Sequence, residues 1–189
     1  MKKLFILGGA YSQVSAIKRA KELGYYVITC DYLPENPGHK YSDEYINIST
    51  TDSKKILSVC EEIEIDGIIA YGSDPGAVTA AYVAEKLHLK GGGLSATQIL
   101  ARKDKFRKFQ NENQMNAPAF ACCSQEAEVE NILDFMLPCI VKPVDSSGSK
   151  GITIVDDPGD LKQAFKYAMG FSRIGKVIFE EYIHTKCGK

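Results

Sequence analysis

The chain has 189 residues, a net charge of −1 and 44% hydrophobic residues, enough for one large domain or for a small domain plus part of another. The near-neutral charge argues against a nucleic-acid surface, which needs a basic excess, and no apolar run approaches the ~20 residues of a membrane span. The opening Met1-Lys2-Lys3 and the apolar residues 4–7 imitate the start of a signal peptide, but Gly8-Gly9 ends that run early, so we predict a buried strand there.

The first half of the chain alternates apolar strands with amphipathic helices. Strands are predicted at residues 4–7, 26–31, 45–48 and 67–70, and helices at 12–23, 53–63 and 75–87. Asp52 or Ser53 is expected to cap the second helix, and Asp74 the third, with Pro75 at its first helical position. This alternation predicts an α/β domain over residues 1–93, built on a small, doubly wound parallel sheet.

The second half follows a different order. After a break at Gly91-Gly92-Gly93, helices are predicted at 95–100 and 103–113, which together form a helical linker over residues 94–116. Beyond it, strands are predicted at 119–122, 138–142, 152–155 and 176–182, and helices at 126–136 and 158–171. This pattern predicts a small α+β unit over residues 117–189.

Cysteine and histidine are scattered along the chain. The six cysteines include no Cys-x-x-Cys pair, and Cys30, Cys60 and Cys139 lie in apolar runs. They are typical of core residues in a reduced, cytoplasmic protein. The three histidines are far apart in the sequence and lack ligand spacing, which argues against a zinc site.

Two turns in the first half are candidates for a substrate site. Gly8-Gly9-Ala10-Tyr11 lies where a Rossmann fingerprint belongs, and Asp31 ends the second strand, where a ribose-binding acid would be. A full dinucleotide site is disfavoured, because the fingerprint needs glycines where Ala10 and Gln13 stand. Gly72-Ser73-Asp74 follows another strand, where a plain helix cap is the alternative. Both turns lie at carboxyl ends of strands, where open α/β sheets bind ligands.

A loop of small residues, Ser146-Ser147-Gly148-Ser149-Lys150-Gly151, joins two predicted strands; we call it the Gly/Ser loop. Backbone N–H groups in such a loop can form a concave anion site, and Lys142 and Lys150 add positive charge, so a polyphosphate suits it. A flexible hairpin with two solvated lysines is the alternative. The loop is not a P-loop, because Lys150 precedes Gly151 and a strand follows instead of a helix.

Two further stretches carry charge at element ends. Lys103 and Lys105 flank Asp104 at the start of a predicted helix, where a lysine opposes the helix dipole; this favours an anionic partner, with a solvated helix face as the alternative. Glu180-Glu181-Tyr182-Ile183 closes the last predicted strand. It is either a strand end with two solvated acids or a hinge whose backbone hydrogen-bonds a planar base.

These motifs together resemble the ATP-grasp superfamily. They are Arg-Lys-Asp-Lys (102–105), Pro-x-x-x-Lys-Pro (138–143), the Gly/Ser loop and the Glu-Glu-Tyr-Ile hinge (180–183), preceded by an incomplete Rossmann-like domain. The chain is similar over essentially its whole length to carboxylate–amine ligases such as biotin carboxylase, the carbamoyl-phosphate synthase large subunit and phosphoribosylglycinamide synthetase. The resemblance implies a Rossmann-like preATP-grasp domain followed by the first, small part of an ATP-grasp domain.

The resemblance also implies roles for individual residues. Lys105 would contact the nucleotide phosphates, Lys142 the phosphate and adenine edge, and the Gly/Ser loop would fold over the β- and γ-phosphates. The hinge residues Glu180, Tyr182 and Ile183 would contact adenine, largely through backbone groups, with Glu181 as a second acid beside them. The implied cofactors are ATP and Mg²⁺. The implied partners are a small-molecule carboxylate and an amine. The two turns of the first domain would hold the acceptor substrate, and a homodimer is compatible with this family.

In the family, an acid for the ribose and a Glu/Asn set for magnesium follow the hinge, so we expect those ligands beyond Lys189. No catalytic residue is assigned within the chain. We therefore expect the front half of an enzyme that binds nucleotide weakly and does not turn over. Two alternatives stay open: a non-catalytic nucleotide-binding module, and an NAD-linked oxidoreductase, which the failed fingerprint disfavours.

Overall fold

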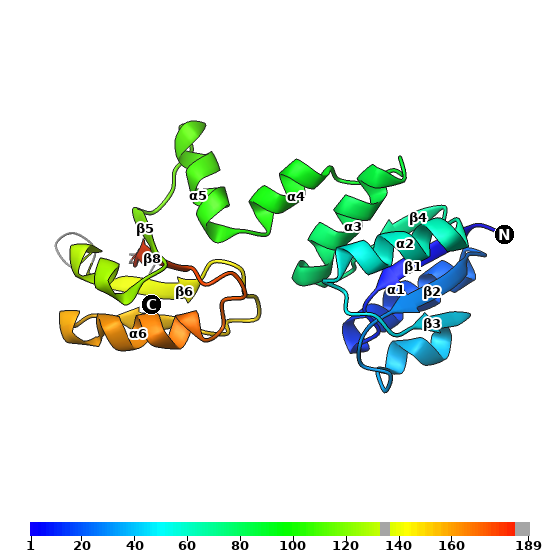
Figure 1. Cartoon of the computed structure of the whole chain (residues 1–189), viewed down its shortest axis with the longest axis horizontal. Helices are drawn as coiled ribbons and strands as arrows, with labels where there is room; N and C mark the ends of the chain where they lie inside the picture. The colour runs from blue at the N-terminus through cyan, green and yellow to red at the C-terminus, as the bar shows by residue number, and fades with distance from the viewer. Residues whose placement is uncertain (133–136, 184–189) are drawn as a thin grey trace, which may run out of the picture. The chain divides into compact units, whose positions relative to one another are not determined.

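The computed structural model describes residues 1–132 and 137–183. The chain divides into two compact units, Met1–Ala101 and Arg102–Lys189, which are drawn together in Figure 1. Helix α4 (Leu94–Leu100) lies in the first unit and α5 (Lys103–Glu112) in the second. The separate linker predicted for residues 94–116 therefore stays a prediction, as do the domain limits on either side of it.

The first unit is the predicted parallel sheet with helices. Its strands are β1 (Lys3–Leu7), β2 (Tyr26–Cys30), β3 (Glu44–Ile46) and β4 (Gly67–Ile69), in the order β3-β2-β1-β4. All neighbouring strands run parallel. Its helices are α1 (Tyr11–Glu22), η1 (a 3₁₀ helix, Pro37–Tyr41), α2 (Ser53–Ile63), α3 (Asp74–Lys86) and α4. The α/β fold class is confirmed.

Alternation along β1 explains why helices cover both faces of this sheet. Phe5 and Leu7 share a buried cluster with residues of α2 and α3. Ile6, which points to the opposite face, packs with Ile17 and Ala20 of α1. Successive strand residues point to opposite faces, so a strand that is apolar on both sides needs helices on both sides.

The helix starts follow local capping chemistry, with one correction. Asp52 caps α2 as predicted, since its carboxylate accepts a hydrogen bond from the Lys55 N–H. The prediction that Asp74 caps α3 is wrong. Ser73 is the cap, with its hydroxyl accepting from the Gly76 N–H, and Asp74 is the first helical residue. Ser73 has the extended backbone that a cap requires, and the charge of Asp74 then lies in the first turn, where the helix dipole favours it.

The second unit is an antiparallel sheet with α6 and η2 packed on one face. Its strands are β5 (Phe120–Cys123), β6 (Cys139–Pro143), β7 (Thr153–Val155) and β8 (Val177–Glu181), in the order β5-β8-β6-β7. Its helices are α5, η2 (Glu126–Ile132), η3 (Pro158–Asp160) and α6 (Leu161–Met169). The small α+β part is therefore present as predicted, with the helix predicted from Pro158 split into η3 and α6.

The helix predicted at 126–136 is a 3₁₀ helix, η2, as far as Ile132, and residues 133–136 lie outside the described part. Val129 and Ile132, three residues apart, are both buried, and that spacing matches the three residues per turn of a 3₁₀ helix.

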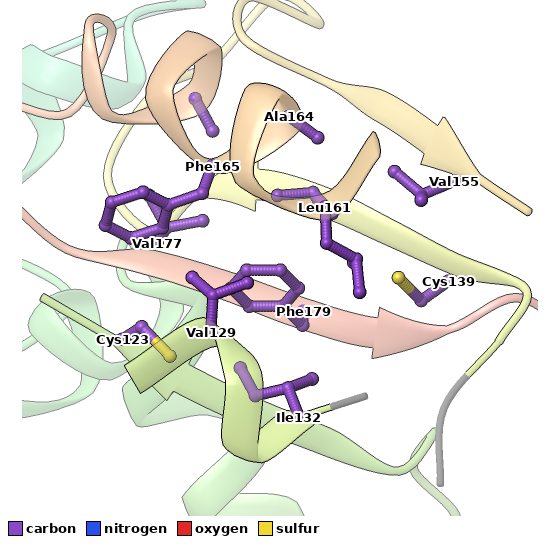
Figure 2. Close-up of a cluster of buried hydrophobic side chains, with 12 residues drawn as sticks. Cys123, Val129, Ile132, Cys139, Val155, Leu161, Ala164, Phe165, Val177 and Phe179 are labelled. Atoms are coloured by element: carbon purple, nitrogen blue, oxygen red, sulfur yellow. The ribbon is translucent and has the colours of Figure 1, made fainter. Parts of the chain in front are cut away.

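The core of the second unit lies between its sheet and the helices α6 and η2. Figure 2 shows Phe179 of β8 surrounded by Leu161 and Phe165 of α6 and by Val129 of η2. Because strand residues alternate, burying Phe179 and Val141 on this face directs Glu180 and Lys142 to the other. The candidate site described next lies on that opposite face.

Candidate functional site

Four side chains from β6 and β8 form a block on the sheet face away from the α6 core. In the antiparallel register, Ile140 pairs with Glu180 and Lys142 pairs with Ile178, so all four project from the same face. Ile178 and Glu180 are buried, with relative exposures of 0% and 2%, whereas Ile140 and Lys142 are partly exposed. The apolar side chain of Ile140 and the ammonium of Lys142 are therefore accessible side by side, which suits a flat base that carries an anionic group.

Glu180 accepts two cationic partners; we call Glu180, Lys142 and Arg107 the Glu180 cluster. The Lys142 ammonium lies 2.5 Å from Glu180 Oε2, and Arg107 Nε donates to Oε1 at 2.9 Å. The side chains of the three residues are only 3%, 16% and 20% exposed for Glu180, Lys142 and Arg107 respectively. Arg107 Nη1 also donates to Gln110 Oε1 at 2.6 Å. Two cations around one carboxylate leave a net positive charge on this face.

A second ion cluster fixes the start of α5. Arg102 donates to both carboxylate oxygens of Asp104, at 3.0 and 2.8 Å, and Lys176 donates to Oδ2 at 3.0 Å. Burial raises the pKa of Asp104, but the hydrogen bonds and charges of Arg102 and Lys176 outweigh it, so the pKa lies below its ordinary value. Lys105, one residue further on, is exposed, and its side chain has no ion-pair partner among the described residues.

The Gly/Ser loop has a fixed entrance and an exposed tip. At the entrance, Lys103 N donates to Val144 O at 3.0 Å, and Lys103 Nζ donates to Ser146 O at 2.6 Å. Asp145 accepts from the Ser172 hydroxyl at 2.8 Å and from two backbone N–H groups, those of residues 173 and 174. Residues 148–150 are exposed at the tip. The loop is therefore held at its base while its tip stays open to a ligand.

The backbone of the loop takes the conformations expected from its composition. Gly148, Ser149 and Gly151 have φ values of 67°, 57° and 72°, in the left-handed region. At Gly151 an added Cβ would lie 2.9 Å from the Phe171 ring, so this position needs glycine for space as well as for its φ. Ser149 occupies the left-handed region without that freedom, which marks the tip as a strained turn.

The hinge residues 180–183 are held by hydrogen bonds to backbone groups of Ala119 and Pro138. Glu181 N donates to Ala119 O at 2.9 Å, and Ala119 N donates back to Glu181 Oε2 at 3.2 Å. Tyr182 N donates to Pro138 O at 3.1 Å, and the Ile183 side chain is exposed. The Glu181 carboxylate thus fixes the entry to β5.

In the first unit, Gln13 joins the two candidate turns. It is 3% exposed, and its Nε2 donates to Tyr71 O at 2.6 Å, next to Gly72. An added Cβ on Gly8, whose φ is 103°, would lie 3.1 Å from the Gln13 side chain. The turns after β1 and β4 therefore lie together, because those strands are neighbours and a buried amide connects their ends.

The side chain of Asp31 is already engaged by its own loop. It accepts from Gly9 N at 3.2 Å, from Leu33 N at 3.1 Å and from Asn36 Nδ2 at 3.0 Å. The backbone of Gly9 packs so closely on His39 that an added Cβ would lie 2.1 Å from that ring. Tyr11 is 86% exposed at the start of α1.

The described part of the chain offers neither a group of metal ligands nor a reactive thiol at Cys30 or Cys60. Within residues 1–132 and 137–183, no group of three His, Cys, Asp or Glu side chains could hold a metal ion. Cys30 and Cys60 are buried, and burial raises the pKa of each thiol to about 12. Among the same residues, no helix is long and apolar enough to cross a membrane.

No family model matches the chain. In sequence, it is similar to the formate-dependent phosphoribosylglycinamide formyltransferase of Burkholderia lata, with 31% identity over 192 residues, which cover 96% of this chain and 46% of that protein. The protein of that name from Prochlorococcus marinus strain MIT 9303 is 27% identical and is covered over 48% of its length.

Solved structures of related enzymes also match almost the whole of this chain. Phosphoribosylglycinamide synthetase from Anaerococcus prevotii matches 97% of this chain and 46% of its own, with 24% identity and a TM-score of 0.67. N5-carboxyaminoimidazole synthetase from Staphylococcus aureus, solved with ADP, matches 98% of this chain and 48% of its own, with 19% identity and a TM-score of 0.78. The resemblance to the front half of ATP-grasp ligases is confirmed. The chain spans about half the length of the curated relatives that it matches.

Within the second unit, the structure brings several of the predicted residues together. Lys142 and Glu180 are in direct contact, and the Gly/Ser loop follows β6, the strand that carries Lys142, after two intervening residues. Lys105 lies on α5, the helix whose Arg107 reaches Glu180. In the first unit, the turns at residues 8–11 and 72–74 are neighbours. The ligand roles of all these residues stay predictions.

Four residues that organise these ATP-grasp elements were missed from the sequence. They are Gln13, Arg107, Asp145 and Lys176. Each acts through a partner far away in the sequence, up to 73 residues for Arg107. None of the four carried a local signal; Gln13, for example, lies in a helix start of mixed polarity, between Ser12 and Val14.

Proposed function

We propose that the chain supplies the front part of the nucleotide site of a Mg-ATP-dependent ATP-grasp ligase, which joins a carboxylate to an amine through an acyl phosphate. The observation that carries the proposal is the block on the second sheet, with Lys142 beside Ile140 and Ile178 and the Gly/Ser loop attached to the same strand. ADP is present in the solved Staphylococcus aureus relative, and MgADP in a biotin carboxylase domain of 17% identity and TM-score 0.76.

The residues present fit the nucleotide. Ile140, which is partly exposed, offers apolar surface to a base, and the net positive charge of the Glu180 cluster suits the phosphates. Lys105 and the exposed loop tip would add a further cation and backbone N–H donors, which is what phosphoryl transfer needs, since its transition state spreads charge over oxygens. Phosphorylation turns a carboxylate oxygen, a poor leaving group, into one that an amine can displace.

We propose that Mg²⁺ accompanies the nucleotide, since MgADP is present in the solved biotin carboxylase domain. The two turns of the first unit are proposed to bind the acceptor substrate, supported by their junction at Gln13. The relatives' names make formate and phosphoribosylglycinamide the first carboxylate and amine to test. A cytoplasmic location rests on the free buried thiols. A homodimer, as in the biotin carboxylase domain, can be tested by light scattering.

Calorimetric titration of the chain with ATP tests the proposal, and NADH serves as the comparison ligand. We expect ATP to bind, and Lys142→Met to weaken it by about tenfold or more, because a charged hydrogen bond is lost. The matched control is Lys108→Met, which removes an exposed lysine of α5. No ADP release is expected from residues 1–189 alone. Saturable NADH binding without ATP binding would instead support the oxidoreductase alternative.

A further inference from the structure

The Glu180 cluster holds more positive charge than its single carboxylate needs. Glu180 is 2% exposed and faces Lys142 from β6 and Arg107 from α5. One cation suffices to compensate one buried carboxylate, so the second is in excess. The two cations differ in how firmly they are held.

Arg107 is fixed on two sides. Its Nε and Nη2 face the Glu180 oxygens at 2.9 and 3.5 Å, and its Nη1 is held by Gln110 at 2.6 Å. Gln110 is itself 9% exposed and donates to Asn116 O at 3.1 Å. A planar guanidinium held on both edges is a preorganised counterion. Lys142, in contrast, carries one compact ammonium on a flexible stem.

We propose that Arg107 is a positioning residue: it stays with Glu180 as the permanent counterion, so that Lys142 is free to turn from Glu180 to a nucleotide phosphate. This inference rests on the nucleotide site proposed above. With Arg107 in place, Glu180 remains paired after Lys142 moves. Without Arg107, Lys142 becomes the only cation on Glu180 in this cluster, and moving it would leave a buried carboxylate uncompensated.

The competing explanation is that Arg107 only anchors α5 to the sheet. Lys176 provides the matched control, because its ammonium also ties α5 to the rest of the second unit through a carboxylate, that of Asp104, without touching Glu180. If Arg107 were only an anchor, Arg107→Met and Lys176→Met would have equivalent effects. Loss of such an anchor would also lower the affinity for every ligand of the site alike, whether or not the ligand carries phosphates.

The test measures the affinities of ATP and adenosine for the chain by calorimetry. Arg107→Met is expected to lower the affinity for ATP by about tenfold. The affinity for adenosine should stay within about twofold of wild type, because adenosine has no phosphate for Lys142 to contact. Arg107→Lys should restore most of the ATP affinity. Lys176→Met should leave the affinity for ATP near that of wild type.

A double variant that combines Arg107→Met with Glu180→Gln tests the mechanism directly. A glutamine at 180 needs no counterion, so Arg107→Met should have no further effect on ATP affinity in an Glu180→Gln background. Additive losses in the double variant, equal losses for ATP and adenosine, or unchanged ATP affinity in Arg107→Met would each overturn the inference while wild type still binds ATP. Failure of wild type to bind ATP would overturn the proposed site itself. Circular dichroism verifies folding, and the double variant replaces Arg107→Met if that variant unfolds.

Discussion

Neutralising Asp104 should destabilise the second unit in a way that depends on pH. Asp104 accepts three hydrogen bonds from the charged donors of Arg102 and Lys176, and Asp104→Asn keeps the shape while removing the charge. Hydrogen bonds to charged groups are worth about 1.5–3 kcal/mol each, but Arg102 and Lys176 are 25% and 35% exposed, so water recovers part of the loss. We expect the free energy of unfolding to fall by about 2 kcal/mol at pH 7.

The sign of the pH dependence follows from the lowered pKa of Asp104. Its contribution to stability is fully present above the unfolded pKa of about 3.9, and is lost as the pH falls through the lower folded value. The difference between wild type and Asp104→Asn should therefore shrink below about pH 4.

The assay is hydrogen exchange of the β8 amides, followed by mass spectrometry from pH 3 to pH 7, since exchange reports the second unit separately. Glu112→Gln on the same helix is the control, because its pair with Lys108 is exposed and should contribute under about 0.5 kcal/mol. A loss in Asp104→Asn that is the same at all pH values, or no larger than that of Glu112→Gln, would refute the reasoning.

Three further predictions concern the core, the loop and the thiols. Phe179→Ala should lower the free energy of unfolding by about 3–5 kcal/mol in urea titration, since Phe179 is fully buried; a loss under about 1 kcal/mol would contradict the packing in Figure 2. Asp145→Ala should speed hydrogen exchange of the backbone amides of residues 173 and 174, because the Asp145 carboxylate accepts their hydrogen bonds; unchanged exchange there would contradict its role in holding the base of the loop. Cys30 and Cys60 should resist iodoacetamide at pH 8 until the chain unfolds, and rapid labelling of native protein would count against their raised pKa.

Strands and helix limits could be predicted because their signals are local. The apolar run that becomes β1 ends at Gly8, and α2 begins after the cap Asp52. Where two neighbouring residues can both cap, as at Ser73 and Asp74, the choice depends on a backbone conformation that the pattern does not specify. Likewise, the three-residue spacing of Val129 and Ile132 fits an α-helix and a 3₁₀ helix equally.

The candidate site could be predicted only in part. Lys142 and the Gly/Ser loop were visible because a strand, a lysine and small residues follow one another in the sequence. The Glu180 cluster was not, since its members come from α5, β6 and β8, and only the sheet register brings them into contact. Long-range charge pairing of this kind leaves no periodicity in the sequence.

The most direct test of the central claim, that the second unit carries a nucleotide site, is an amide NMR titration of the labelled chain with ATP. The account predicts shifts at Lys142, in the Gly/Ser loop and at residues 180–183, with β2 and β3 of the first unit unchanged. Saturating shifts confined to the turns at residues 8–11 and 72–74, or no shifts at all, would contradict it.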